Sequence, residues 1–139
     1  MSTTYLLIEE SGNNPILVGY VSLLADSIRI TETPVLTEFF SNKGINYHTL
    51  PALKIGRLAL NHTMQGKGYG RKMIGFSIAM LFRISKLIGC RFLTVDSKKE
   101  AVEFYKKLGF GEAHLKPRET TKMYLDTVIP KMPNNRNFG

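Results

Sequence analysis

The sequence predicts one α+β domain of three layers, with helices packed on a mixed, mostly antiparallel sheet around a central β–α–β unit. Three features predict this class. Segments of alternating apolar residues lie toward both ends of the chain, a long apolar helix pattern lies in the middle, and glycines join that helix to the strands beside it. We expect the domain to span residues 1–129 of the 139, followed by a flexible tail over 130–139 that is rich in Pro and Asn.

The elements ahead of the centre are a hairpin and a short helix. Thr33 suits the N-cap of that helix and Pro34 its first position. The predicted order is a strand over 5–9, a turn over 11–15, a strand over 16–28, a helix from 33 to about 40, a polar loop over 42–49 and a strand over 51–60.

The central helix is predicted over 69–88. Its apolar residues cover most of its surface, so we expect it to be largely buried. They are Met73, Ile74, Phe76, Ile78, Met80, Leu81, Phe82, Ile84 and Ile88. Gly89 is the expected stop, and a short buried strand over 90–95 follows. A strand–helix–strand unit of this kind predicts two parallel strands.

A second helix and two closing strands complete the predicted sheet. Ser97 can cap the helix, and Glu100 three residues later completes a capping-box pattern. We expect this helix to run to Leu108 and to stop at Gly109. The closing strands are predicted over 110–115 and 122–128.

Charge is distributed unevenly along the chain. The net charge is +8, but residues 1–53 hold two basic and five acidic residues (net −3), whereas 54–139 hold seventeen basic and six acidic (net +11). Such a field attracts the phosphates of a nucleotide or a nucleic acid. The alternative is a lysine-rich surface that serves solubility.

The composition also favours some compartments over others. No apolar run approaches the ~18 residues that span a bilayer, and the N-terminus lacks the features of a signal peptide. Cys90 is the only cysteine, so no internal disulfide can form, and we expect a cytoplasmic protein without a membrane partner. Because no His/Cys cluster has metal-ligand spacing, we expect no metal site.

The most specific signal is the glycine-rich turn that opens the central helix, Gln65-Gly66-Lys67-Gly68-Tyr69-Gly70-Arg71. A helix N-terminus presents unpaired amides and a partial positive charge, and glycines let an anion approach them. The turn lacks the Gly-Lys-Ser/Thr of a Walker loop and the glycine spacing of a dinucleotide fingerprint. It matches a third pattern, Gln/Arg-x-x-Gly-x-Gly/Ala.

This third pattern resembles motif A of the GNAT superfamily of N-acetyltransferases, which bind the pyrophosphate of acetyl-CoA there. Two other segments strengthen the resemblance. Ile55-Gly56-Arg57-Leu58-Ala59-Leu60 is similar to the splayed strand beside the pantetheine arm, and Phe104-Tyr105 followed by Gly109-Phe110 is similar to the Phe-Tyr-x-x-x-Gly-Phe of motif B. The resemblance covers roughly residues 5–127 and implies the GNAT fold and acetyl-CoA as cofactor.

A narrower resemblance is to the acetyltransferase toxins of bacterial toxin–antitoxin pairs, which acetylate the α-amine of aminoacyl-tRNA. It rests on Gly19-Tyr20-Val21-Ser22-Leu23, on the Ile-Gly-Arg-Leu-Ala segment with a proline ahead of it, and on the long helix. It implies charged tRNA as an acceptor and an antitoxin as a partner. Those toxins carry a helical segment ahead of the first strand that helps to shape the acceptor side, whereas this sequence begins almost at that strand.

The resemblance also assigns roles to single residues. Tyr105 becomes the general acid, because a phenol near ~10 is protonated at neutral pH and close enough in acidity to a thiol near ~8.5 to protonate the leaving sulfur. The alternative is a packed core aromatic. A bulge in the strand would aim an amide at the thioester oxygen. The implied cofactor-binding set is Leu58 and Leu60, through their backbone, with Gln65, Gly66, Lys67, Gly68, Tyr69, Gly70 and Arg71.

The sequence does not assign the general base to a single residue. Many relatives carry a glutamate on the strand before the turn, but residues 53–60 contain no acid. An α-amine near ~7.7–8.0 is already partly neutral, whereas a lysine side chain near ~10.4 is not. This favours an α-amine acceptor or a water-relayed base, with Glu32, His48 and His62 as substitutes.

Three functions are compatible with these patterns. The first is an N-acetyltransferase acting on aminoacyl-tRNA, and the second an N-acetyltransferase acting on a small-molecule amine or a protein N-terminus. The third is a non-catalytic CoA-binding or RNA-binding module of the same fold. Exposed strand edges could also pair two copies into a homodimer.

Overall fold

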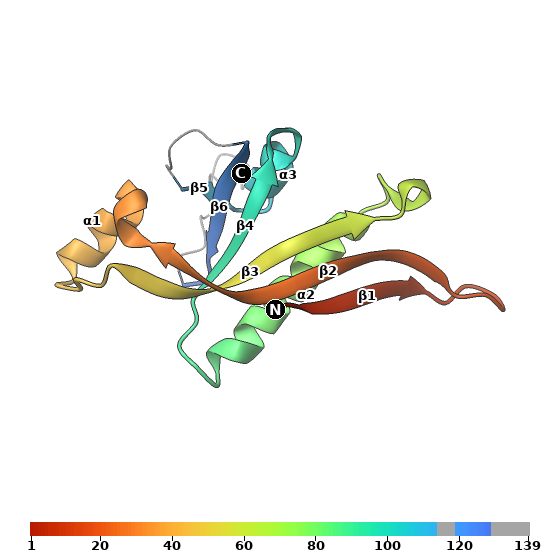
Figure 1. Cartoon of the computed structure of the whole chain (residues 1–139), viewed down its shortest axis with the longest axis horizontal. Helices are drawn as coiled ribbons and strands as arrows, with labels where there is room; N and C mark the ends of the chain where they lie inside the picture. The colour runs from red at the N-terminus through yellow and green to blue at the C-terminus, as the bar shows by residue number, and fades with distance from the viewer. Residues whose placement is uncertain (114–118, 129–139) are drawn as a thin grey trace, which may run out of the picture.

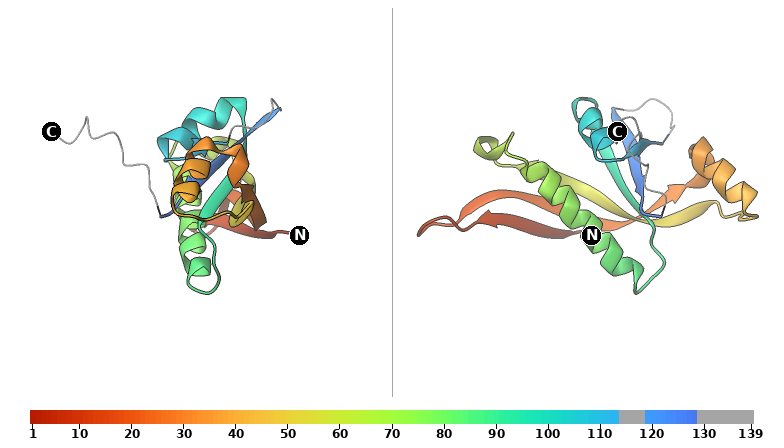
Figure 2. Two further views of the ribbon diagram at one scale, coloured as in Figure 1. Left: turned by 90° about the vertical axis from the view of Figure 1, so that its left-hand side faces the viewer. Right: turned by 180° about the vertical axis from the view of Figure 1, so that it is seen from behind.

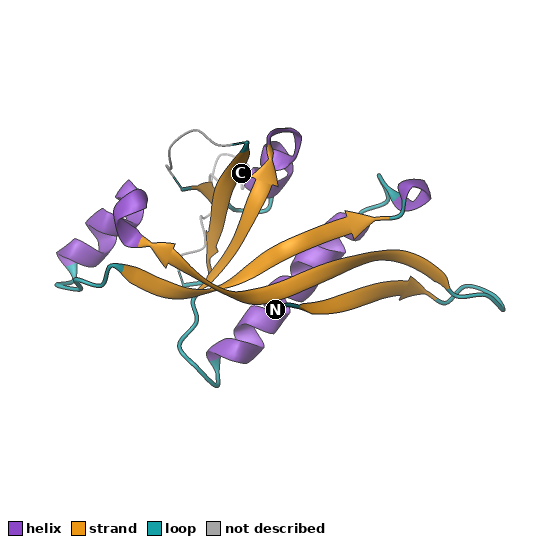
Figure 3. Ribbon diagram, in the orientation of Figure 1, coloured by secondary structure: helices purple, strands orange, loops and turns teal. Residues whose placement is uncertain are grey.

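The computed structural model describes residues 1–113 and 119–128. One six-stranded sheet has the order β1-β2-β3-β4-β6-β5, and only β3 and β4 are parallel, which confirms the mixed, mostly antiparallel prediction (Figures 1 and 3). The strands are β1 Thr3–Glu9, β2 Ile16–Arg29, β3 Thr49–Leu60, β4 Phe92–Lys98, β5 Gly111–Glu112 and β6 Thr120–Asp126. The helices are α1 Pro34–Asn42, α2 Tyr69–Ser85 and α3 Val102–Lys107, with short 3-10 turns at Ile30–Glu32, His62–Met64 and Lys99–Ala101.

The two faces of the sheet carry separate apolar cores. Leu93 of β4 packs with Met73 and Leu81 of α2 and with Tyr105 of α3. Its neighbour Phe92 packs with residues of α1. Because successive side chains of a strand point to opposite faces, α1 covers the face opposite α2 and α3. Figure 2 shows α2 crossing the strands when the sheet is seen from behind.

Helix α2 is shorter and less buried than the sequence predicts. It ends at Ser85, so Gly89 is not its stop. Residues of one stripe face the sheet, whereas the side chains of Phe76 and Phe82 are 39% and 49% exposed. The prediction of a largely buried helix was wrong, because no described element packs on the outer side of α2 and a helix on one face of a sheet buries only one stripe.

Of the two predicted N-caps, Thr33 is confirmed in position and Ser97 was wrong. Ser97 is buried inside β4, its hydroxyl donates to the Lys98 carbonyl oxygen, and α3 begins only at Val102. The pairing of β4 with β6 continues through Lys98, so Ser97 belongs to the strand and cannot cap a helix. Thr33 does occupy the N-cap position of α1, but its buried hydroxyl makes no capping bond.

The closing strands differ from their predicted lengths. The strand predicted over 110–115 is β5, only two residues long, and residues 114 and 115 lie outside the described part of the chain. The strand predicted over 122–128 is β6, which begins two residues earlier and ends at Asp126. The predicted tail over 130–139 also lies outside the described residues.

The predicted stop of α3 at Gly109 is confirmed. The Gly109 amide donates to the Lys106 carbonyl oxygen at 3.0 Å and the Phe110 amide to that of Tyr105 at 3.1 Å, while Gly109 has a φ of +98°. These two hydrogen bonds form a Schellman motif, in which the first and last residues make an apolar contact. Here that contact joins the Tyr105 and Phe110 rings, 5.3 Å apart. The Phe-Tyr-x-x-x-Gly-Phe spacing therefore encodes a helix end that fixes Tyr105.

Strands β3 and β4 stay paired for only four residues, 52–55 with 92–95. At that point Ser22 pairs with Arg57 while Leu23 pairs with Ile55, so Gly56 is the extra residue of a bulge in β3. Bulges bend and twist the strand that carries them. Beyond the bulge β3 follows β2 and β4 follows β6, and the two strands separate (Figure 1). Beyond Ile55 and Val95 the facing edges of β3 and β4 are therefore unpaired, and we call this separation of the strands the opening.

Candidate active site

The glycine-rich turn forms the N-terminus of α2. Gly66 and Gly68 have φ values of +78° and +85°, a left-handed conformation that other L residues adopt at a cost, and Gly68 is the N-cap. The first helical bond runs from the Lys72 amide to the Gly68 carbonyl oxygen at 3.3 Å. Within the described residues, no amide of 65–71 donates a hydrogen bond to the protein. Free amides at a helix N-terminus are donors of the kind that bind anions.

The basic side chains of the turn are open to solvent. Lys67, Arg71 and Lys72 form no ion pair with an acidic side chain in the described part of the chain. The ammonium group of Lys72 lies 5.3 Å from the centre of the Tyr69 ring. Desolvation and the nearby Glu9 carboxylate raise the pKa of Tyr69, so its phenol stays neutral beside these cations. The predicted turn residues thus present positive charge and hydrogen-bond donors together.

Gly70 brings three predicted segments together. A Cβ atom at Gly70 would lie 3.3 Å from Cζ of Phe104 and 3.7 Å from Cδ1 of Leu60. The start of α2 therefore packs against the end of β3 and against the residue that precedes Tyr105. The side chains of Leu58 and Leu60 pack against the larger core, and both residues lie on the part of β3 that no longer pairs with β4. The glycine turn, the unpaired edge of β3 and α3 therefore meet at Gly70.

Tyr105 follows Phe104 in α3 and is nearly buried, with 6% of its surface exposed. Its ring packs between those of Phe104 and Phe110, with centroids 5.2 and 5.3 Å away. Burial raises the pKa of its hydroxyl, which keeps the phenol protonated. Among the described residues nothing forms a hydrogen bond with that hydroxyl, so its proton is available for a ligand.

Two acidic side chains that were not predicted as site residues lie on the face away from α2. Asp96 follows the last β3–β4 pair and its Oδ2 lies 2.7 Å from Nζ of Lys54. Asp26 accepts a hydrogen bond from the Thr94 hydroxyl at 2.7 Å. Burial alone would raise the pKa of Asp26, but the bonds from Thr94 and the backbone, with the charges of Lys122 and Lys54, lower it overall. Asp96 could have been found, because ligands gather beyond the carboxyl ends of parallel strands.

The three substitutes proposed for the base are placed differently. His48 precedes β3, at the end remote from the opening. His62 is exposed in the 3-10 turn that follows β3, next to the glycine turn. The side chain of Glu32 lies outside the described part of the chain. Of the two histidines, His62 is the one close to the opening.

Comparison with known proteins identifies this arrangement. The model of the acetyltransferase (GNAT) domain family matches residues 3–112. The chain belongs to the GNAT family. It is accordingly an acyltransferase that uses acetyl-CoA.

Solved structures with the same fold include those of KacT, AtaT and AtaTR. A tyrosine-to-phenylalanine mutant of KacT has a TM-score of 0.76 and 26% identity, covering 91% of this chain and 72% of that one. AtaT complexed with acetyl-methionyl-tRNAfMet has a TM-score of 0.77 and 23% identity, with the same coverage. AtaTR bound with acetyl-CoA has a TM-score of 0.70 and 24% identity, covering 91% and 71%.

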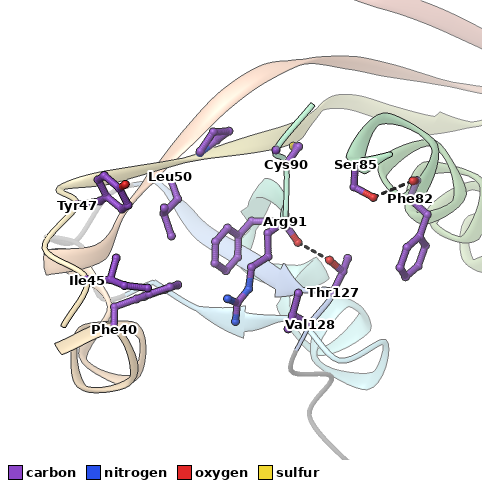
Figure 4. Close-up of a pocket in the computed structure, with 13 residues that line it drawn as sticks. Phe40, Ile45, Tyr47, Leu50, Phe82, Ser85, Cys90, Arg91, Thr127 and Val128 are labelled. Atoms are coloured by element: carbon purple, nitrogen blue, oxygen red, sulfur yellow. Dashed lines mark hydrogen bonds between the residues drawn. The ribbon is translucent and has the colours of Figure 1, made fainter. Parts of the chain in front are cut away.

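A separate apolar pocket lies at the other end of this GNAT domain, with a volume of about 430 Å³ (Figure 4). Its lining includes Phe82 and Ser85 near the end of α2, so the 17-residue helix, ~1.5 Å per residue, puts it about 25 Å from the glycine turn. Arg91 in its wall is paired with Asp126 through two bonds of 2.7 Å, so it is not a free anion site. Cys90 lies there too, and burial raises the pKa of its thiol, which disfavours the nucleophilic thiolate.

Two further properties concern metals and membranes. Within residues 1–113 and 119–128, no three His, Cys, Asp or Glu side chains gather closely enough to hold a metal ion. No helix of that part is both long and apolar enough to cross a bilayer.

Proposed function

We propose that this GNAT domain transfers the acetyl group of acetyl-CoA to the α-amine of an aminoacyl-tRNA. The observation that supports it most is that the free amides of the glycine turn, Leu60 at the end of β3 and Phe104, the residue before Tyr105, meet around Gly70. In the proposed complex the amides of 65–71 bind the pyrophosphate, with Lys67 and Arg71 adding charge. The backbone of Leu58 and Leu60 pairs with the pantetheine arm, as a peptide adds to a sheet edge.

The chemistry then follows from the opening between β3 and β4. The neutral amine attacks the thioester carbonyl carbon, a C–N bond forms, and the C–S bond breaks. An amide at the Gly56 bulge donates to the oxygen on which negative charge develops. Tyr105 gives its proton to the departing sulfur, and the amine nitrogen gives up one proton, so the products are an amide and the free thiol of CoA.

Two observations support a tRNA acceptor: exposed lysines near the opening, and a shared fold with a protein that binds tRNA. Lys98, Lys99 and Lys107 are exposed at the α3 side of the opening and have no acidic partner within the described residues. Such cations bind phosphates. A protein of the same fold is known in complex with acetyl-methionyl-tRNAfMet. A small-molecule amine or a protein N-terminus is the second candidate acceptor.

Acetylation of charged tRNA is the expected activity. Labelled acetyl-CoA should transfer label to aminoacyl-tRNA faster than to free amines or peptides, because RNA phosphates add contacts that small acceptors lack. Replacing Lys98 and Lys99 with glutamine should raise the KM for tRNA and lessen its salt dependence, with the KM for acetyl-CoA unchanged. Efficient acetylation of a small amine or peptide with tRNA left untouched would refute the tRNA assignment.

We also propose an antitoxin partner and a cytoplasmic location. A structure of the same fold is that of AtaT bound to the C-terminus of the antitoxin AtaR. Acetyl-CoA and charged tRNA are cytoplasmic substrates. Expression should therefore arrest growth, and an antitoxin encoded nearby should relieve the arrest.

A homodimer through β1 is the remaining partner proposal. β1 is an edge strand, and Leu6 and Ile8 on its outer face are 60% and 49% exposed. It lies in the part of the chain with net charge −3, where two copies approach without the repulsion of the basic region. Light scattering should give twice the chain mass, and Ile8→Lys should give the monomer, because a charged edge strand resists pairing. A monomeric parent would rule this dimer out.

A further inference from the structure

We propose that Asp96, which is paired with Lys54, is the residue that binds the primary ammonium group of the acceptor. The proposal rests on acetyl transfer to an amine, as proposed above, but not on which molecule carries the amine. It supplies the acidic group that is absent from residues 53–60 of β3.

The position of Asp96 is set by the separation of the strands. The last parallel pair joins Ile55 to Val95, and Asp96 is the next residue along β4. Lys54 is the residue before Ile55, and its ammonium group reaches Asp96 at 2.7 Å. The ion pair therefore spans β3 and β4 at the vertex of the opening, where the thioester of the proposed complex lies.

The face on which the pair lies fits an incoming acceptor. Thr94 belongs to the face of α1, because it alternates with Leu93 and Val95 of the α2 core, and Asp96 shares the face of Thr94. On the opposite face α2 and α3 pack over the vertex. In Figure 1 α2 lies behind β3, and no described helix covers the near side of the opening. An acceptor therefore reaches the thioester from the side of Asp96.

Of the two carboxylates at this point, Asp96 is the one that can accept further hydrogen bonds. The ion pairs of the described residues at this point join Lys54 of β3 to Asp96 of β4 and Lys122 of β6 to Asp26 of β2. Asp26 is engaged by Thr94 and by Lys122. Asp96 has one partner among the described residues, Lys54, and its side chain is 42% exposed. An ionised carboxylate with open lone pairs accepts a hydrogen bond from an ammonium group.

The same contact completes the proton balance. The acceptor first loses one proton to solvent as it becomes a neutral amine. After its nitrogen bonds to the carbonyl carbon, that nitrogen carries a positive charge and loses a second proton to Asp96. The Tyr105 hydroxyl protonates the sulfur. Solvent then returns the proton from Asp96 to Tyr105, so both side chains are restored.

Methionine methyl ester tests the site without RNA, since it carries a primary α-ammonium group. Its binding to the CoA complex is measured by NMR titration. We expect weak, saturable binding with shifts near Asp96, and at least ~10-fold weaker binding by Asp96→Asn, a loss of ~1.4 kcal/mol or more. Asp96→Glu should retain part of the affinity. Glu103→Gln, which removes the same charge from the exposed surface of α3, should match the parent.

The variant Lys54→Met separates this role from a structural one. If Asp96 binds the acceptor, removing its competing cation should keep or raise the affinity for the ester. If the pair only stabilises the sheet, Lys54→Met and Asp96→Asn should behave alike. The proposal is overturned if they behave alike, if Asp96→Asn binds like the parent, or if the parent does not bind the ester. Failure to acetylate tRNA, with ester binding intact, would refute the tRNA assignment alone.

Discussion

Replacing Gly68 with aspartate should reduce acetyl-CoA binding by ~100-fold or more, measured by calorimetry. Gly68 is the N-cap of α2, and a Cβ there meets no atom within 4 Å, so a side chain meets no steric barrier at its first atom, although the φ of +85° strains it. The new carboxylate would lie among the free amides of 65–71 and repel the pyrophosphate. A repulsion of several kcal/mol corresponds to two or more orders of magnitude in Kd.

Gly68→Asn is the matched control. Asparagine has nearly the same shape, tolerates the φ of +85° about as well as any residue except glycine, and carries no charge. We expect it to weaken binding far less than aspartate does, with thermal stability similar in the two variants. Equal binding by the parent and Gly68→Asp would remove the glycine turn from the cofactor site.

Replacing Tyr105 with phenylalanine should slow CoA release by ~10²- to 10⁴-fold, which is the range for loss of a general acid. Phenylalanine keeps the ring that packs between Phe104 and Phe110, and no hydrogen bond within the described residues is lost. Stability and the Kd of acetyl-CoA should therefore stay near those of the parent. An unchanged rate of CoA release in stopped-flow assays would mean that Tyr105 is only a packed aromatic.

The pH dependence gives a second test of Tyr105. Only the protonated phenol can donate, and burial raises its pKa. The fall in rate that comes from loss of this proton should therefore occur above the ordinary phenol value of ~10. In Tyr105→Phe that alkaline fall should be absent. A rate that falls through a pKa below 10 and does so equally in both proteins belongs to another group.

The local patterns of the sequence were sufficient for the order of elements, the β–α–β unit and the helix stop at Gly109. Each depends on a few neighbouring residues: alternation, a glycine that allows a left-handed turn, or the spacing of Tyr105 and Phe110 across that turn. The glycine turn was predictable for the same reason, because its conformation and its free amides are local properties of 65–71.

Features that depend on contacts between distant segments were harder to predict from the sequence. The exposure of Phe76 and Phe82 depends on what covers α2, which a helical pattern does not contain. Ser97 pairs with β6 as part of β4, so the helix does not start where its capping-box pattern predicts. The bulge was expected in general terms, but its place at Gly56 depends on the register between β2 and β3. Lys54 and Asp96 are 42 residues apart in sequence and meet only because these strands pair.

A crystal structure with acetyl-CoA tests the central claim most directly. The account predicts pyrophosphate oxygens within hydrogen-bond distance of the amides of 65–71, pantetheine along the free edge of β3, and the Tyr105 hydroxyl within reach of the sulfur. Since Tyr105 is only 6% exposed, the last contact is the most demanding. A pyrophosphate bound elsewhere, or a sulfur out of reach of Tyr105, would contradict the account.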